Sequence, residues 1–230
     1  MQLVGRAPHV RAGGLVVGLE PSCTTVFRSD MAELFPTDQD VHRLRDQTVT
    51  VAELLTDHTP GWEAPRLPDG TRVTALAQVH CHQHAVLGWD RDEALLGDVG
   101  VDVEHLESGC CGLAGNFGFT EGHGEVSEAC AEQVMLPKLR DSDPHDVVLA
   151  DGFSCRTQIH DLDSGGRDGV HLVELLDALA GGPVDGATLP LCRPPTPSAV
   201  ERGAALAGAG VALAAAAAGI TRLVRGTRPG

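Results

Sequence analysis

The chain has 230 residues and a formal net charge of −15, and only 3% of its residues are aromatic, with no tyrosine among them. A core made mainly of Val, Leu and Ala suits sheets covered by helices better than a sandwich that relies on large rings, so we expect an α/β fold. Before residue 193, acidic residues outnumber basic ones by thirty-one to twelve. Such a surface repels phosphate backbones, which argues against nucleic-acid binding by the folded part.

The seven cysteines are an odd number, and residues 1–6 lack the basic start and apolar run of a secretory leader. A chain of this length can bury a core without disulfide bonds. We therefore expect a reducing, cytoplasmic location in which thiolates are free to bind metal.

The first region begins with an apolar run at residues 15–19, which predicts a buried strand that stops at the turn formed by residues 20–23. A helix is expected from about residue 24 to residue 35. Residues 40–57 also have a helical pattern, whereas the proline spacing in residues 59–68 prevents a helix there.

The second region alternates strands with helices, which predicts a parallel, doubly wound sheet. In such sheets the ligand crevice lies beyond the carboxyl ends of the strands. The expected elements are strand 74–79, helix 85–99, strand 103–106, helix 124–140, strand 147–150, helix 158–162 and a closing helix at 171–180.

An internal duplication is indicated by residues 16–23 and 148–155, which share an apolar strand, an acid near its end and a terminal Ser-Cys. Chance similarity is the alternative. The first copy is preceded by too few residues to supply the other cysteines of the second, so it is incomplete: either the chain is the C-terminal piece of a longer polypeptide or its first unit has lost its site. The expected domains are 1–58, a remnant of the first repeat; 59–72, a linker; 73–182, the second repeat; and 183–230, a Pro-rich linker with a basic Ala/Gly-rich tail.

The tail contains eighteen uninterrupted apolar residues, 203–220, followed by Arg222, Arg225 and Arg228. This length and these flanks permit a membrane helix. Because Ala and Gly gain little from hydrocarbon, a flexible or partly helical tail is favoured over a membrane anchor.

Four cysteines form the pattern C-x28-C-C-x43-C: Cys81, the adjacent pair Cys110 and Cys111, and Cys155. Each lies at or just after the end of an expected strand, so we expect the four thiols to meet at one edge of the sheet. Thiolates select zinc, copper(I) or iron–sulfur clusters over calcium and magnesium. The paired C-x2-C knuckles of structural zinc sites are missing, which favours an iron–sulfur cluster.

Glycines surround the cysteine pair, and Gly112 with its neighbours would bring backbone N–H groups close to an anionic cluster. A tight turn with reactive or idle thiols is the alternative. Cys130 has the helical spacing of a small buried residue. Cys23 and Cys192 lack visible partners, and we do not expect any of these three to be a ligand.

Three histidines, His80, His82 and His84, alternate around Cys81 and would face one side together in a strand. We interpret them as hydrogen-bond donors around the metal ligands, and the alternatives are direct metal ligation and ordinary hydrogen bonds at a strand end. His123 is expected beside the cluster, in a structural polar contact first and in a proton or ligand role second. No G-x-G-x-x-G, P-loop, G-x-S-x-G or H-E-x-x-H element occurs in a supporting context, so self-contained substrate chemistry is not evident.

Residues 18–23, 80–84, 108–118 and 150–158 together resemble the CCG-type cysteine-rich domain. This domain occurs in heterodisulfide reductases, in the iron–sulfur subunits of glycolate and anaerobic glycerol-3-phosphate dehydrogenases, and fused to FAD-linked oxidases. The stretches are most similar to the C-terminal end of long bacterial fusion proteins that resemble D-lactate or D-2-hydroxyglutarate dehydrogenases. The resemblance covers about residues 1–180.

The resemblance implies that electrons leave a 2-hydroxy acid through FAD and pass along iron–sulfur centres. This chain would be a relay without catalytic residues of its own, holding a 4Fe-4S cluster on Cys81, Cys110, Cys111 and Cys155. Its partners would be an FAD-binding dehydrogenase domain and a ferredoxin-like domain, neither of which is present in these 230 residues.

The family pattern usually closes in C-x-x-C, but here Gly152 stands at the first position and leaves Cys155 alone. This departure argues against the noncubane cluster of the heterodisulfide reductase relatives. Two other functions stay open: a docking module stabilised by zinc without a redox role, and, ranked last, a thiol–disulfide enzyme that uses the vicinal pair.

Overall fold

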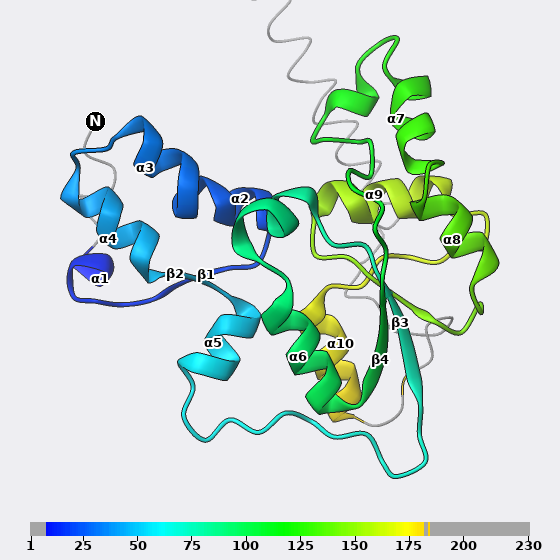
Figure 1. Cartoon of the computed structure of the whole chain (residues 1–230), viewed down its shortest axis with the longest axis horizontal. Coiled ribbons are helices and arrows are strands. Elements are labelled where there is room, and N and C mark those ends of the chain that lie inside the picture. The colour runs from blue at the N-terminus through cyan, green and yellow to red at the C-terminus, as the bar shows by residue number, and fades with distance from the viewer. Residues whose placement is uncertain (1–7, 182–183, 185–230) are drawn as a thin grey trace, which may run out of the picture. The chain divides into compact units, whose positions relative to one another are not determined.

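The computed structural model describes residues 8–181 and 184, and these residues form an α/β fold with two parallel sheets (Figure 1). The expected fold class is confirmed. Strands β1 and β2 pair in register from Val16 opposite Thr48, and β3 pairs with β4 on one side and with β5 on the other. The strands are β1 (Val16–Gly18), β2 (Thr48–Thr50), β3 (Val73–Ala77), β4 (Val101–His105) and β5 (Val147–Leu149).

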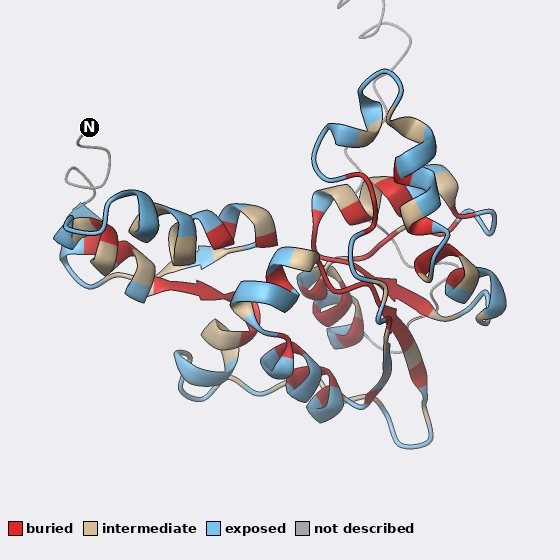
Figure 2. Cartoon of the chain, turned by 45° about the horizontal axis from the view of Figure 1, so that its top comes forward, coloured by how far each residue is buried: buried red, intermediate tan, exposed pale blue. Residues whose placement is uncertain are grey.

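Helices cover both faces of the three-stranded sheet, because alternate side chains of a strand point to opposite faces. Residues Ala75, Ala77 and Leu149 pack with helices α6 (Asp90–Val99) and α10 (Leu172–Ala180). On the other face, Leu76 and Val148 pack with α8 (Met135–Asp141) and α9 (Phe153–Leu162). The sheet is therefore doubly covered, and Figure 2 shows β3 and β5 among the most buried parts of the chain.

The first helical run begins at Pro21, three residues before the expected start at residue 24. Proline suits the first helical position, and the Glu20 side chain caps this helix by accepting a 2.7 Å hydrogen bond from the Cys23 backbone N–H. Cys23 therefore lies within a helix and not in a turn. The run comprises α2 (Pro21–Thr25), a π-helical segment η2 (Val26–Asp30) and α3 (Met31–Leu34).

The expected helical region at 40–57 is wrong in its middle, where β2 separates α4 (Gln39–Gln47) from α5 (Val51–Asp57). The three residues of β2 are β-branched and buried, which favours a strand. Thr50 then starts α5 through a capping box with Glu53. A short helix, α1 (Pro8–Arg11), precedes β1, and residues 59–68 contain neither helix nor strand, as the prolines predicted.

Two expected helices of the second region are each divided. The segment 85–99 consists of η3 (Gln83–Leu87) and α6, separated at Gly88, whose φ is 88°. The segment 124–140 consists of α7 (Gly124–Ala131) and α8, separated at Val134 with φ −142°. A short 3-10 helix, η4 (Phe117–Phe119), precedes α7. Helix α9 starts at Phe153, five residues before the expected position, so it includes Cys155.

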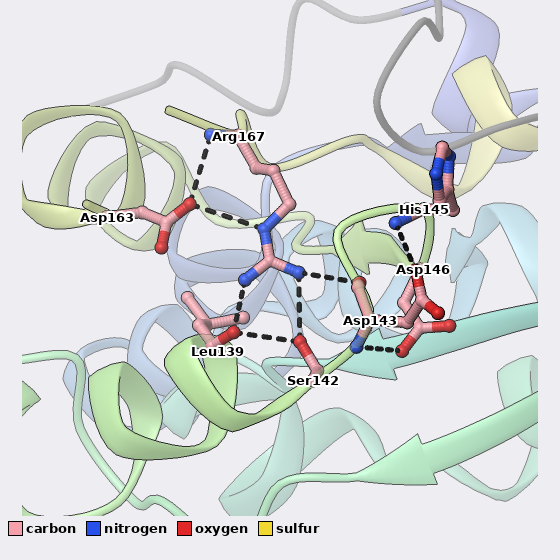
Figure 3. A network of polar contacts seen from close by, with 7 residues as sticks. All are labelled: Leu139, Ser142, Asp143, His145, Asp146, Asp163 and Arg167. Carbon is pink, nitrogen blue, oxygen red and sulfur yellow. Dashed lines mark hydrogen bonds and ion pairs between the residues drawn. The ribbon is translucent and has the colours of Figure 1, made fainter. Parts of the chain in front are cut away.

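A buried arginine, Arg167, joins the end of α8 to the segment after α9 (Figure 3). Its guanidinium donates to the Leu139 carbonyl, to Ser142 Oγ at 2.9 Å and to the Asp143 carbonyl at 3.2 Å. The side chains of Arg167 and its ion-pair partner Asp163 are 7% and 1% exposed. Arg167 therefore satisfies carbonyls at the helix end and fixes the two helices that cover one face of the sheet.

No helix in the described part of the chain is both long and apolar enough to cross a membrane. The apolar stretch 203–220 and Cys192 lie outside the described residues, as does the rest of the expected tail apart from residue 184.

Candidate metal centre

The four cysteines of the sequence pattern lie together at the carboxyl ends of β3, β4 and β5. Cys81 follows β3, Cys110 and Cys111 lie in the loop after β4, and Cys155 is the third residue of α9. The Cys155 thiol hydrogen-bonds to Cys111, and the Cys81 thiol hydrogen-bonds to Cys110 and interacts with Cys111. These four side chains, called the thiol cluster below, therefore lie at one edge of the sheet and interact with one another.

The thiol cluster is buried on one side and open on the other. Cys155 and Cys111 are 1% and 3% exposed, Cys81 is half-buried, and Cys110 is exposed. A group held by all four sulfurs would therefore be reachable from the Cys110 side.

Hydrogen bonding shifts the pKa values of the two buried thiols, Cys111 and Cys155, in opposite directions. The hydrogen bond from Cys155, helped by the backbone N–H groups of Leu113 and Ala114, lowers the pKa of Cys111 to about 6. The same hydrogen bond and burial raise the pKa of Cys155 well above its ordinary value. Burial, followed by the neighbouring Cys110, raises the pKa of Cys81. The lowered pKa favours the thiolate form of Cys111, the form in which cysteine binds metal.

The loop that carries the cysteine pair is fixed from both neighbouring elements. Gln78, which follows β3 and is 1% exposed, donates from Nε2 to the Gly109 carbonyl at 3.4 Å and accepts from Ser108 Oγ at 2.5 Å. On the other side, Ser154 Oγ accepts from the Gly115 N–H at 2.9 Å. Gln78 was not among the predicted site residues, although a single amide beside the apolar run of β3 is a signal from which it could have been found.

Gly112 occupies a position in which no other residue fits. Its φ is 95°, and an added Cβ would lie 2.1 Å from the Ser127 carbonyl oxygen of α7. Its N–H donates to Cys110 Sγ at 3.4 Å, as expected for an amide beside a thiolate ligand. The Cβ of Cys130 borders the same contact at 2.9 Å, so Cys130 packs against the loop.

The three histidines around Cys81 do not share one strand face, because β3 ends at Ala77 and the chain becomes helical at Cys81. His80 is 4% exposed; its Nδ1 accepts from the His82 N–H at 3.1 Å and lies 3.9 Å from Cys81 Sγ. Burial lowers the pKa of His80, which keeps the ring neutral. The His82 ring stacks on His80 at 5.3 Å, whereas His84 lies near His105 at 6.1 Å.

His123 contacts an aromatic ring and not the thiol cluster. Its ring stacks on Phe117 with centroids 4.3 Å apart, and its buried Nδ1 has no hydrogen-bond partner among the described residues. The contact of His123 in the described residues is therefore ring stacking and not the expected polar contact, and its proton or ligand role stays a prediction.

Gly152 provides the space for the His80 ring. A Cβ at residue 152 would lie 2.2 Å from His80 Cδ2, closer than any real contact of a Cβ. The imidazole therefore fills the place beside Gly152, and a cysteine at this position would not fit without moving His80.

No family model matches the chain. Part of the chain is similar to D-2-hydroxyglutarate dehydrogenases. The identity is 29% over 147 residues with the protein of that name from Pseudomonas putida, covering 63% of this chain and 13% of the relative. The relative from Haemophilus influenzae is 28% identical over 158 residues, which cover 63% of this chain and 14% of the relative. The relative from Pantoea ananatis is 25% identical over 162 residues, which cover 68% of this chain and 15% of the relative. The chain thus spans 13–15% of the length of these relatives.

The turn after β1 lies against the thiol-bearing region. Ser22 Oγ is 3.2 Å from His80 Nε2, and His171 Nε2 donates to the Leu19 carbonyl at 2.7 Å. A hydrogen bond to Glu20 is the main cause of a raised pKa at Cys23, and Cys23 itself is exposed. Cys23 is thus a protonated thiol that interacts with Glu20, and it is separate from the thiol cluster.

A small cavity separates this turn from the one after β5. Its volume of about 20 Å³ is enough for one water molecule, and Leu19, Gln83, Asp92, Asp151 and His171 are among its lining residues. Asp92 is 3% exposed, and burial, followed by the nearby charge of Asp151, raises its pKa to about 7. Gln83 Nε2 donates to Asp92 at 3.3 Å, which links the cavity to the segment that follows Cys81.

Two larger cavities lie elsewhere. Their volumes are about 640 and 860 Å³; both border Leu55, Trp62 and Arg66, and neither is lined by a residue of the thiol cluster. The cysteines are therefore placed at the strand ends and not in these two larger cavities.

Proposed function

We propose that this chain is the iron–sulfur electron-transfer module of an FAD-linked 2-hydroxy-acid dehydrogenase. The observation that carries the proposal is the placement of four interacting thiols after three neighbouring strands, at the carboxyl edge of one sheet. An all-sulfur donor set of this kind fits an iron–sulfur cluster. Cys81, Cys110, Cys111 and Cys155 would hold it, with 4Fe-4S as the proposed type.

A cluster on these thiolates would supply one-electron transfer between a flavin and a further acceptor. The protein side of this function is to present sulfur in its ionised form and to exclude water from part of the site. The lowered pKa of Cys111 serves the first purpose, and the burial of Cys111 and Cys155 serves the second. The exposed Cys110 leaves a side from which a partner can exchange electrons.

The substrate class is proposed from the relatives, which carry the name D-2-hydroxyglutarate dehydrogenase. Because the chain corresponds to only a small part of their length, we assign FAD and substrate binding to another domain or subunit. A ferredoxin-like domain is the second proposed partner. We further propose a cytoplasmic location and no binding of nucleic acid, in line with the acidic composition.

Anaerobic purification followed by iron, sulfide and zinc analysis tests the proposal. We expect iron and acid-labile sulfide in stoichiometric amounts, with a visible absorption band and a paramagnetic signal in one redox state. Cys111→Ser should abolish cluster loading because it removes a proposed ligand. The matched variant Cys130→Ser should leave loading unchanged, because Cys130 packs beside Gly112 and is not one of the four proposed ligands. Equal effects of the two substitutions would contradict the ligand assignment.

A zinc-stabilised docking module is the second candidate, favoured by one observation. The ligand atoms of His80, Cys81 and His82 lie within 4.8 Å of one another, and such a mixed nitrogen and sulfur set suits zinc. Stoichiometric zinc without a cluster signal would reject the electron-transfer function, and a loss of that zinc in His82→Asn would support this candidate. Rapid alkylation of Cys110 or Cys111 without metal loss would instead favour thiol–disulfide chemistry.

A further inference from the structure

Three polar side chains connect the turn after β1 to the residue that precedes Cys81. Ser22 Oγ lies 3.2 Å from His80 Nε2 and donates its own proton to Glu20 Oε1 at 3.1 Å. The second carboxylate oxygen of Glu20 accepts from the Cys23 N–H at 2.7 Å. Ser22 and His80 are 58 residues apart, so this connection is a tertiary one.

The direction of each hydrogen bond in this chain is determined by its neighbours. His80 Nδ1 accepts from the His82 backbone N–H at 3.1 Å and therefore carries no proton. In the neutral ring the proton must then be on Nε2, which donates to Ser22 Oγ. Ser22 in turn donates its own proton to Glu20. The Glu20 carboxylate is the last group in this series of hydrogen bonds and accepts from both Ser22 and the Cys23 N–H.

The His80 ring, which these hydrogen bonds orient, is in contact with the thiol cluster. His80 Nδ1 lies 3.9 Å from Cys81 Sγ, and the ring is enclosed by Gly152 on one side and by the stacked ring of His82 at 5.3 Å. A rotation of the ring would break the hydrogen bond to the His82 N–H, which holds the turn that presents Cys81. The orientation of His80 and the position of Cys81 are therefore coupled.

We propose that Glu20 and Ser22 are positioning residues for the thiol cluster, acting through His80 to fix the turn that presents Cys81. Their effect on metal binding rests on the proposed function, whereas their effect on His80 does not. The turn after β1, which sequence analysis assigned to a remnant of a first repeat, thus has a role in the site of the second.

The state of His80 in the metal-free protein provides the first test. We expect nitrogen-15 NMR of the histidine rings to show His80 with its proton on Nε2, the resonance being assigned by its loss in His80→Gln. Ser22→Ala should remove the hydrogen bond and yield exchanging tautomers, and Ser22→Thr, which keeps a hydroxyl, should restore the original spectrum. An unchanged His80 signal in Ser22→Ala would overturn the proposal.

The affinity for metal in the whole chain is the second test. Loss of a hydrogen-bond partner around metal ligands typically weakens metal binding by about 10- to 100-fold. We expect a loss in this range for Ser22→Ala, a smaller one for Glu20→Gln because the amide oxygen still accepts from Ser22, and rescue by Ser22→Thr. Asp38→Asn is the matched control, because Asp38 caps α4 through Asp40 and Val41 as Glu20 caps α2.

The two tests separate the two ideas. If the wild-type chain binds neither iron nor zinc, the proposed function fails, while the His80 tautomer still decides whether the hydrogen-bond chain orients the ring. If metal binds and Ser22→Ala holds it as tightly as Asp38→Asn does, the positioning role is wrong and the metal centre stands.

Discussion

Two turns in this chain have the same local design and different surroundings. The turn after β1 has Glu20 as the helix cap, and the turn after β5 has Gly152 in the same place. In both, a Ser-Cys pair follows at the second and third helical positions. Yet Cys155 is 1% exposed and hydrogen-bonded to Cys111, whereas Cys23 is exposed and interacts with Glu20.

The difference between the surroundings of Cys155 and Cys23 arises from the strands that neighbour each turn, not from the turns themselves. Strand β5 lies beside β3, and the loop that follows β3 carries Cys81 to the cluster. Strand β1 pairs with β2 alone among the described residues, and β2 leads into a helix that has no cysteine. A Ser-Cys turn becomes part of a thiol site only when neighbouring strands deliver further thiols to the same edge.

The largest expected effect is on metal content and compares the two cysteines directly. Cys155→Ser should abolish stoichiometric metal binding because it removes one of four ligands, whereas Cys23→Ser should leave the metal content unchanged. Elemental analysis of anaerobically purified variants provides the measurement. Loss of metal in both variants would mean that the two turns serve one centre, and the contrast between them would disappear.

The next effect concerns the ion pairs that hold the two regions. Arg167→Met should destabilise the fold by about 3 to 5 kcal/mol, because it leaves the buried Asp163 charge without its partner. Arg28→Met breaks the pair with Glu53, whose side chains are 25% and 20% exposed, and should cost about 1 kcal/mol. Urea unfolding measures the free energy of unfolding of both variants. Equal losses in that free energy would show that the more buried ion pair contributes no more to stability than the partly exposed one.

A pH-dependent effect is expected at the cavity between the two turns. The folded-state pKa of Asp92 is raised to about 7 from an ordinary value of 3.8, so the folded chain binds a proton that the unfolded chain releases. Stability should therefore fall as the pH rises from about 4 to about 7. Asp92→Asn should remove this loss and stabilise the chain by about 2 to 4 kcal/mol at pH 8, with little effect at pH 4.

Thermal unfolding of wild type and Asp92→Asn across this pH range checks the sign. The difference between the two proteins isolates Asp92, since Asp151, His80 and other groups titrate in both. A constant difference at all pH values would contradict a protonated Asp92 in the fold.

The smallest effect tests the fit of His80 against the second turn. Gly152→Ala places a Cβ 2.2 Å from the ring and should destabilise the fold by about 1 to 3 kcal/mol. Gly97→Ala in α6 is the matched control: nothing lies within 4 Å of its added Cβ, and alanine should stabilise the helix by about 0.5 to 1 kcal/mol. Equal stability of both variants in urea would show that His80 moves freely.

Much of the fold could be predicted from sequence, because apolar strands and amphipathic helices follow simple periods. The alternation in residues 73–180 predicted the parallel sheet, and the four cysteines follow its strands as expected. Strand β2 was missed because Thr48 to Thr50 is too short to produce a period of its own between two helices. The breaks at Gly88 and Val134 depend on local backbone conformation that propensity does not specify.

The positions of the candidate cysteines after the strands could be predicted, whereas the contacts that support them could not. The cysteines have a distinctive spacing, so they could be found without coordinates. Gln78 and Ser22 act through contacts with residues 30 to 58 positions away, and no local sequence pattern indicates such contacts. His84 was expected beside His80 on a strand face, but the helical turn at Cys81 directs it toward His105.

The unequal burial of the thiol cluster has a consequence for handling the protein in air. Peroxide and dissolved oxygen reach sulfur through solvent, and a thiolate is more readily oxidised than a thiol. Cys110 is the exposed member, and its chain neighbour Cys111 has the lowered pKa. Oxidative damage should therefore begin at this adjacent pair, and mass spectrometry of aerobically stored protein should find sulfenic or sulfinic acid there before it appears at Cys155.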